Sequence, residues 1–131
     1  MLSCENFAYL FSNWYYIHIL YQIIICLATL QIMKTHNIKI CNPITNLNSE
    51  IECGENISIL DAAEKNKICL PSSCLSGQCS SCVAKILSGS ILQNSQNFLD
   101  LSQLENGFAL LCVSYPVSDI SLLSHQENFI F

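Results

Sequence analysis

The stretch from Pro71 to Ala84 reads PSSCLSGQCSSCVA, and its cysteines decide how the chain is interpreted. They follow a C-x4-C-x2-C spacing at Cys74, Cys79 and Cys82, and a further cysteine stands at Cys112. Thiolates are soft metal ligands, and sulfur-bound sites need backbone N–H donors close by. The residues between these cysteines are small and uncharged, and Gly77 tolerates unusual backbone angles. The stretch therefore predicts a loop that folds its main chain tightly around a metal centre.

The spacing of the four cysteines favours one kind of metal centre over two others. It is typical of a [2Fe–2S] cluster held by four thiolates. A structural zinc site usually pairs two short C-x2-C-like knuckles, which this spacing does not provide. A Rieske-type cluster needs two histidines beside the cysteines, and the three histidines are scattered at His18, His36 and His125. We expect a [2Fe–2S] cofactor bound by Cys74, Cys79, Cys82 and Cys112.

The flanking sequence is similar to that of a known family. From Leu70 to Glu127 the text LPSSCLSGQCSSCVAKILSGSILQNSQNFLDLSQLENGFALLCVSYPVSDISLLSHQE resembles, almost without gaps, the [2Fe–2S] ferredoxins of chloroplasts and cyanobacteria. Upstream, NISILDAAEKNK resembles the helix that precedes the cluster loop in that family. The resemblance covers roughly residues 34–127. It implies that Cys74 and Cys79 bind the outer iron, and Cys82 and Cys112 the inner one.

The resemblance also implies a function and a set of partners. The chain is expected to be a monomeric one-electron carrier rather than an enzyme, in the stroma of a plastid. Photosystem I is the implied donor and ferredoxin–NADP reductase the implied acceptor, each docked transiently. Phe98, Asp100 and Glu127 stand where the family carries partner-docking residues. Leu101 and Ser102 depart from the family, which usually has further acids there, and Leu75 replaces a usual arginine.

Two other functions remain open on the residues alone. The chain could be the electron-transfer module of a multi-component oxygenase, although it has no flavin- or NAD-binding motif. It could also be a metal-stabilised, zinc-containing interaction domain without redox function. A visible absorption spectrum separates the last case, because zinc sites are colourless.

Composition sets limits on the class of protein. Of 131 residues, 51% are apolar and 11% are charged, which permits a hydrophobic core and argues against disorder. The net charge of −5 argues against nucleic acid as a partner. The cysteines outside the predicted site form no obvious disulfide framework, so we expect free thiols in a reducing compartment. These are Cys4, Cys26, Cys41, Cys53 and Cys69.

The N-terminal stretch differs from the rest of the chain. Residues 7–33 contain no Asp, Glu, Lys or Arg and are about long enough to cross a bilayer as a helix. Polar interruptions such as Asn13 and Gln22 weaken that interpretation. We divide the chain into an apolar extension, residues 1–32, and a ferredoxin domain, residues 33–131. The extension is spurious, removed or a membrane anchor, and only in the last case does the protein meet a membrane.

The order of predicted elements indicates an α+β fold. Strands are expected at residues 35–41, 50–53, 83–87, 91–92, 107–113 and 118–123, with a turn at Tyr115-Pro116 and a short helix within residues 95–105. One main helix is expected after Ser58, with Ser58 as N-cap and Asp61 completing a weak capping box. The resemblance sharpens this prediction to the ferredoxin-type β-grasp fold, a mixed sheet with one main helix and a cluster-binding loop.

Overall fold

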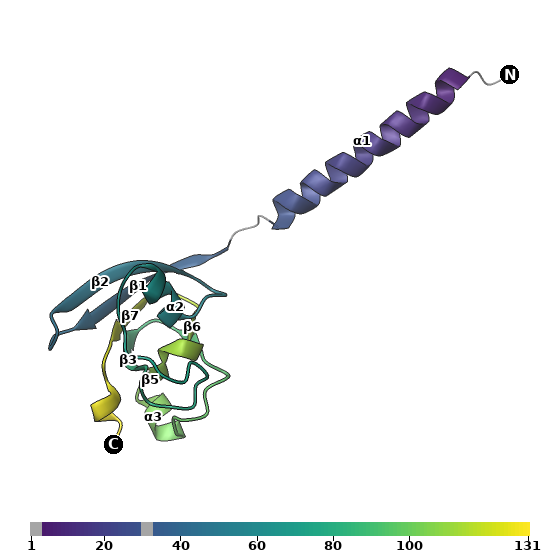
Figure 1. Cartoon of the computed structure of the whole chain (residues 1–131). Coiled ribbons are helices and arrows are strands. Elements are labelled where there is room, and N and C mark those ends of the chain that lie inside the picture. Colours follow the sequence, from purple (N-terminus) through teal and green to yellow (C-terminus); the bar gives the residue numbers. More distant parts are fainter. Residues whose placement is uncertain (1–3, 30–32) are drawn as a thin grey trace. The chain divides into compact units, whose positions relative to one another are not determined.

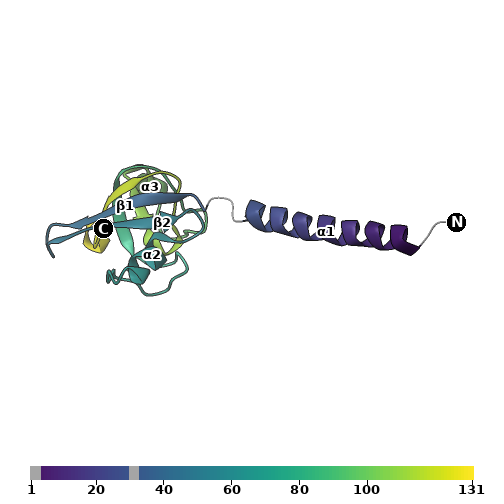
Figure 2. The ribbon, with the colours of Figure 1, turned by 90° about the horizontal axis from the view of Figure 1, so that it is seen from above.

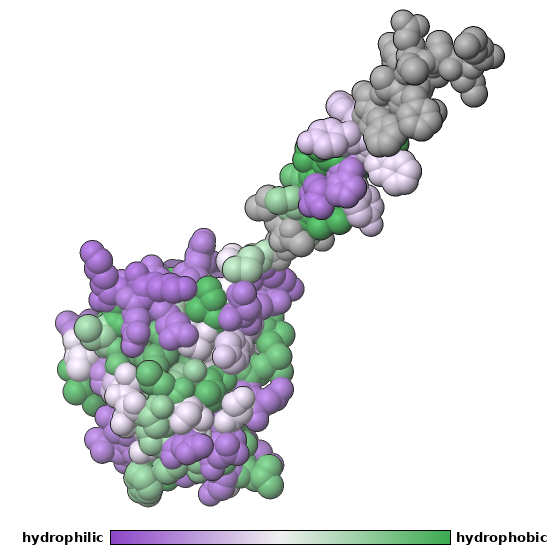
Figure 3. Space-filling model, turned by 45° about the vertical axis from the view of Figure 1, so that its right-hand side comes forward, coloured by the Kyte–Doolittle hydropathy of each residue, from purple (hydrophilic) through white to green (hydrophobic). Residues whose placement is uncertain are grey.

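The computed structural model describes residues 4–29 and 33–131, and the chain divides into two compact units, Met1–Met33 and Lys34–Phe131 (Figure 1). The first unit contains helix α1, Cys4–Thr29. Its described side chains, such as Trp14, Tyr21 and Leu27, are exposed. Figure 3 shows green, hydrophobic residues beside pale and purple ones along this helix. The apolar stretch predicted at residues 7–33 includes residues 30–32, which lie outside the described part.

Within residues 4–29 and 33–131, none of the helices combines the length and the hydropathy that a membrane span needs.

The second unit is built on a five-stranded mixed sheet. Its order is β2-β1-β7-β3-β5, with β1 and β7 parallel and the other neighbours antiparallel. The strands are β1 Thr35–Asn42, β2 Leu47–Gly54, β3 Val83–Ser88, β5 Phe108–Leu110 and β7 Ile120–Leu123. A second, two-stranded sheet pairs β4, Ile91–Leu92, with β6, Tyr115–Pro116. This mixed sheet with few helices confirms the predicted α+β, β-grasp architecture.

The β1–β2 hairpin follows the alternation expected of a half-buried strand pair. In β1 the side chains of His36, Ile38 and Ile40 are buried, whereas those of Thr35, Asn37 and Lys39 are exposed. All eight residues of β1 pair with β2, from Thr35 opposite Gly54 to Asn42 opposite Leu47. Strand β2 therefore begins at Leu47, three residues before its predicted start, because the pairing with β1 continues up to the turn.

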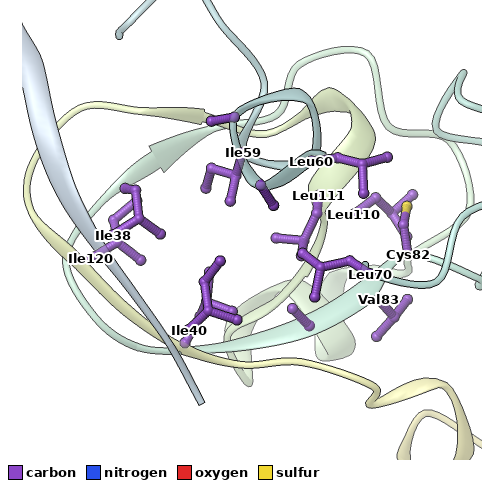
Figure 4. Packing of buried hydrophobic residues seen from close by; sticks show 14 of the residues in the cluster. Ile38, Ile40, Ile59, Leu60, Leu70, Cys82, Val83, Leu110, Leu111 and Ile120 are labelled. Carbon is purple, nitrogen blue, oxygen red and sulfur yellow. The ribbon is translucent and has the colours of Figure 1, made fainter. Parts of the chain in front are cut away.

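Helix α2, Ile59–Lys65, is the predicted main helix. The hydroxyl of Ser58 accepts a hydrogen bond from the Asp61 backbone N–H at 3.1 Å, which confirms Ser58 as the N-cap. The helix contacts β2 and the 3₁₀ helix η1, Leu111–Val113, and lies beside β2 (Figures 1 and 2). Ile59 and Leu60 are fully buried and point into the same core as Ile38 (Figure 4). Burial of this apolar face fixes the helix to the sheet.

Two predictions near the fourth cysteine are wrong. Residues 107–113 do not form one strand: β5 ends at Leu110, and Leu111–Val113 form a 3₁₀ helix, η1, that carries Cys112. The apolar run resembled a strand, but the Leu111 N–H donates to the Cys82 carbonyl at 3.1 Å and the chain turns there. Tyr115–Pro116 is the strand β6 rather than a turn, because it pairs with β4.

The remaining elements are short. Helix α3, Leu101–Glu105, confirms the predicted short helix within residues 95–105. A second 3₁₀ helix, η2, covers Glu127–Phe129 near the C-terminus. The side-chain amide of Gln103 in α3 donates to the Ile130 carbonyl at 2.9 Å, so the C-terminal segment is tied to α3.

Candidate metal centre

The cluster loop, residues 70–82, connects α2 to β3 and contains no helix or strand. It carries Cys74, Cys79 and Cys82, and Cys82 directly precedes β3. The pairing of Val83 in β3 with Leu110 in β5 brings the end of the loop beside η1. As a result the sulfur atoms of Cys82 and Cys112 lie 3.3 Å apart. Residues thirty positions apart in the sequence are thus placed together by one strand pair.

Gly77 allows the loop to pack closely against a neighbouring segment. Its φ is +75°, and a Cβ atom there would lie 2.9 Å from the Ser95 carbonyl oxygen and 3.0 Å from a methyl carbon of Val113. The Asn97 backbone N–H donates to the Gly77 carbonyl at 2.9 Å and holds the two segments together. The predicted need for glycine at this position is confirmed, because any side chain would collide with backbone.

The environment of Cys74 favours its thiolate. The Ser76 backbone N–H points at the Cys74 sulfur at 3.5 Å. Hydrogen bonds from the Ser76 backbone N–H, then the Ser76 side chain, the Gln78 backbone N–H and the Cys79 thiol lower the Cys74 pKa to about 6. These donors stabilise negative charge on sulfur, which is what a metal-bound thiolate and the sulfides of a cluster require.

The environment of Cys82 disfavours its thiolate. Its side chain is buried, and burial is the main cause that raises its pKa to about 12, with the neighbouring Cys112 thiol adding to the shift. A buried thiol of this kind ionises readily only when a cation is present to compensate the charge. Metal binding at Cys82 would therefore be coupled to loss of its proton.

The four thiols are arranged as two pairs. The Cys74 thiolate accepts from Cys79, and Cys82 contacts Cys112. Within the part of the chain that the structure describes, no three His, Cys, Asp or Glu side chains converge on a point that would hold a single metal ion. Two thiol pairs suit a centre with two irons better than the single tetrahedral ion of a zinc site. These residues therefore fit a [2Fe–2S] cluster.

Three further cysteines, Cys41, Cys53 and Cys69, lie outside the predicted ligand set. Cys53 in β2 is buried, and its sulfur lies 3.3 Å from the Ile57 carbonyl oxygen. Burial is the main cause that raises its pKa to about 11, followed by the negative charge of Asp61. Cys41 in β1 is half-buried, and Cys69, directly before the cluster loop, is exposed. Cys53 behaves as a small core residue rather than as a reactive thiol.

The three predicted docking residues have different surroundings. Phe98 is half-buried and packs against the core. The Asp100 carboxylate is the N-cap of α3 and accepts from the Gln103 backbone N–H at 2.8 Å, in a reciprocal capping box. Glu127 in η2 is half-buried, and its Oε2 atom is buried without a hydrogen-bond partner in the structure. Asp100 thus has a structural role that was not among the predictions from the sequence.

Sequence reasoning missed the support of the loop. Ser95 and Asn97 contact the loop at Gly77, whereas the sequence predicts only a short helix within residues 95–105. Leu75 also has a positive φ of 57°, which the sequence gives no reason to expect for a leucine. The run of Asn, Gln and Ser in this segment could have predicted these contacts, because such residues form turns and hydrogen bonds with backbone.

Comparison with known proteins gives a family match. The model of the 2Fe-2S iron–sulfur cluster binding domain matches residues 44–117. Over 98 residues the chain is 47% identical to the vegetative ferredoxin of Trichormus variabilis, covering 75% of this chain and 99% of that protein. It is 46% identical to a heterocyst ferredoxin of Microchaete diplosiphon over the same length. Ferredoxin-6, chloroplastic, of Zea mays is 34% identical over 96 residues, which are 73% of this chain and 61% of that protein.

Solved structures support the same fold. Pectocin M2 superposes with a TM-score of 0.68 at 39% identity, covering 75% of this chain and 35% of that chain. The ferredoxin reductase of carbazole 1,9a-dioxygenase superposes with a TM-score of 0.60 at 25% identity, covering 75% of this chain and 30% of that one. This chain therefore spans about a third of each of these larger proteins.

Proposed function

The chain belongs to the plant-type [2Fe–2S] ferredoxins, which are electron carriers and not enzymes, and from this we propose that it carries electrons from photosystem I to ferredoxin–NADP reductase. The cofactor of the family is a [2Fe–2S] cluster. When bound, such a cluster supplies one-electron redox chemistry at a potential of roughly −400 mV. A carrier of this kind has no substrate to transform, and its action is to dock, exchange an electron and leave.

The observation that supports this proposal best is the pairing of the four cysteines. We assign Cys74 and Cys79 to one iron and Cys82 and Cys112 to the other. The backbone N–H groups of the loop would then stabilise the negative charge on the sulfur atoms, and the buried side chain of Cys82 would shield one side of the centre from water. Burial and hydrogen bonding around the sulfurs are the means by which a protein sets the potential of its cluster.

The alternatives are less well supported. The chain covers nearly the whole of the cyanobacterial ferredoxins it matches but only about a third of the larger redox proteins. A module of a multi-component oxygenase is therefore the weaker hypothesis. A zinc-containing interaction domain is weaker still, because the thiols form two pairs and the matching family model is that of an iron–sulfur domain.

The docking residues and the compartment are part of the proposal. We propose that Phe98 and Glu127 contact the partner beside the cluster, with Asp100 adding charge while it caps α3. The chloroplastic maize ferredoxin among the relatives supports a plastid stroma as the compartment.

Glu127→Lys should slow electron transfer to the reductase at low salt and leave the cluster spectrum unchanged, because docking of this kind depends on complementary charge. Equal rates for the variant and the wild type would remove Glu127 from the docking surface.

The route is tested by reconstitution. Illuminated photosystem I particles are combined with the purified holoprotein, ferredoxin–NADP reductase and NADP, and NADPH formation is followed. We expect NADPH to form only when the holoprotein is present, with a rate that saturates as its concentration rises. If the holoprotein is photoreduced but no NADPH forms, the acceptor is wrong. If it is not photoreduced, the donor is wrong.

A further inference from the structure

Four hydrogen-bond donors point at the sulfur of Cys74. The Ser76 backbone N–H lies 3.5 Å from it, and the Ser76 hydroxyl, the Gln78 backbone N–H and the Cys79 thiol also donate to it. Two of these donors are backbone groups, which a substitution leaves in place, and Cys79 is itself a proposed ligand. The Ser76 hydroxyl is therefore the one donor of this set that a substitution can remove without changing the ligands.

The backbone on both sides of Ser76 is fixed. Leu75 has a φ of 57° and Gly77 a φ of 75°, so Ser76 stands between two left-handed residues. The Asn97 backbone N–H donates to the Gly77 carbonyl at 2.9 Å and holds the far side of the turn. Backbone N–H groups in a turn of this kind point to one side and form a nest for negative charge. The Ser76 donors are thus in place before the sulfur becomes more negative.

The conformation of Leu75 has a cost that packing does not repay. A φ of 57° is unfavourable for a leucine, because the Cβ atom crowds the following carbonyl. The Leu75 side chain is 59% exposed, so burial in the core does not compensate for this conformation. Backbone strain of this kind gathers at functional sites. Here the strained residue lies between Cys74 and Ser76, and its left-handed conformation turns the Ser76 N–H back toward the Cys74 sulfur.

Hydrogen bonds to a ligand sulfur act differently on the oxidised and the reduced centre. Uptake of one electron makes the ligand sulfurs more negative, and a hydrogen bond strengthens as its acceptor gains negative charge. A donor at the Cys74 sulfur therefore stabilises the reduced form more than the oxidised form and raises the reduction potential. No bond breaks in this step, and the Ser76 hydroxyl keeps its proton. Because Ser76 is exposed and water competes for the sulfur, the effect of one hydroxyl is modest.

We propose that Ser76 is a positioning residue that raises the reduction potential of the centre through the hydrogen bond from its hydroxyl to the Cys74 sulfur. The left-handed backbone at Leu75 holds this donor in place. The inference rests on the proposed electron-carrier function and on Cys74 as a ligand. It names the side chain that limits how strong a reductant this carrier is: without the hydroxyl, the reduced protein gives up its electron more readily.

The first test is a spectroelectrochemical titration of the purified holoprotein, without any partner protein. Ser73 is the matched control, since it is exposed on the other side of Cys74 and does not occur among the described donors to the Cys74 sulfur. We expect Ser76→Ala to lower the reduction equilibrium constant about threefold, which is about 28 mV at 59 mV per tenfold for one electron. Ser76→Thr, which keeps the hydroxyl, and Ser73→Ala should match the wild type. Equal potentials for Ser76→Ala and Ser73→Ala would overturn the proposal.

The second test changes the backbone and leaves the hydroxyl in the chain. Leu75→Gly keeps the left-handed conformation without strain, whereas Leu75→Val disfavours it, because a β-branched residue rarely adopts positive φ. We expect Leu75→Gly to keep the wild-type potential and Leu75→Val to lower the equilibrium constant at least threefold. Equal potentials for these two variants would contradict the positioning by Leu75.

The outcome is separate from that of the proposed function. A wild type that holds the cluster but passes no electrons to ferredoxin–NADP reductase would remove the proposed route and leave these potentials valid. A colourless wild type would instead contradict the proposed cluster itself.

Discussion

The β1–β2 hairpin and the cluster loop are held in shape by different interactions. The hairpin is a continuous ladder of backbone pairs with one buried face. The loop has no regular structure, contains two residues with positive φ at Leu75 and Gly77, and turns its N–H groups toward a cysteine sulfur. The hairpin is thus stabilised by the core, whereas we expect the loop to depend on the cluster that we propose it binds. The domain combines a scaffold that folds by burial with a site that is completed by its cofactor.

The strongest test of this difference is to remove a ligand. Cys112→Ala should abolish normal cluster assembly and leave the loop without its fixed shape, because the buried thiol of Cys82 loses its partner. The visible spectrum and iron content of the purified variant measure the effect. Cys69→Ser is the control, since that thiol is exposed and outside the proposed ligand set. A native spectrum at full strength in Cys112→Ala would remove Cys112 from the site.

A change in the buried face of the hairpin should lower stability and leave the cluster intact. Ile40 is fully buried in the interior strand β1, so Ile40→Ala should lower the free energy of unfolding by about 2–5 kcal/mol. The spectrum of the folded fraction should stay native, because the loop is intact. Ile44→Ala in the exposed turn should change stability by no more than about 0.5 kcal/mol. Loss of the cluster from folded Ile40→Ala would mean that the two regions are not separable.

Sequence reasoning succeeded in the two regions for different reasons. In the hairpin, the alternation at Ile38 and Ile40 predicts the strand, because side-chain period and burial coincide. In the loop, cysteine spacing predicts the site, because ligand chemistry restricts spacing even without secondary structure. The helix N-cap at Ser58 was also predicted from the local residue types.

The failures come from contacts between segments distant in the sequence. The 3₁₀ helix at Cys112 was missed because the bond from Leu111 to the Cys82 carbonyl ends the strand, and no local pattern records that bond. Strand β6 was missed because Tyr115–Pro116 looks like a turn until β4 pairs with it. The capping role of Asp100 was visible in principle, since Gln103 follows three residues later.

A smaller effect concerns the buried thiol of Cys53 in β2. The Cys53 pKa is raised to about 11 in the folded state from an ordinary value of 9.0. The folded state therefore holds this proton more tightly, and the stability contribution is complete below pH 9 and declines as pH rises toward 11. Unfolding curves across this range should fall less steeply for Cys53→Ala than for the wild type. Parallel curves for the two proteins would show that Cys53 does not contribute.

The smallest expected effect concerns the N-terminal unit. We propose that a chain beginning at Met33 folds and assembles the cluster as the full chain does, because the core and the four proposed ligands lie within Lys34–Phe131. Its spectrum and its unfolding midpoint should match those of the full chain. A shifted midpoint or a weaker spectrum would show that residues 1–32 support the domain. Mass spectrometry of the native protein then shows whether those residues are retained.

The most direct measurement is an absorption and EPR spectrum of the anaerobically purified protein, oxidised and then reduced, together with its iron and zinc content. A [2Fe–2S] centre predicts a coloured, EPR-silent oxidised state and a reduced state with one unpaired electron per cluster. It also predicts iron and no zinc, and reduction only by a strong reductant. A colourless protein that contains zinc, or one whose iron gives no signal on reduction, would contradict the assignment of this chain as a one-electron carrier.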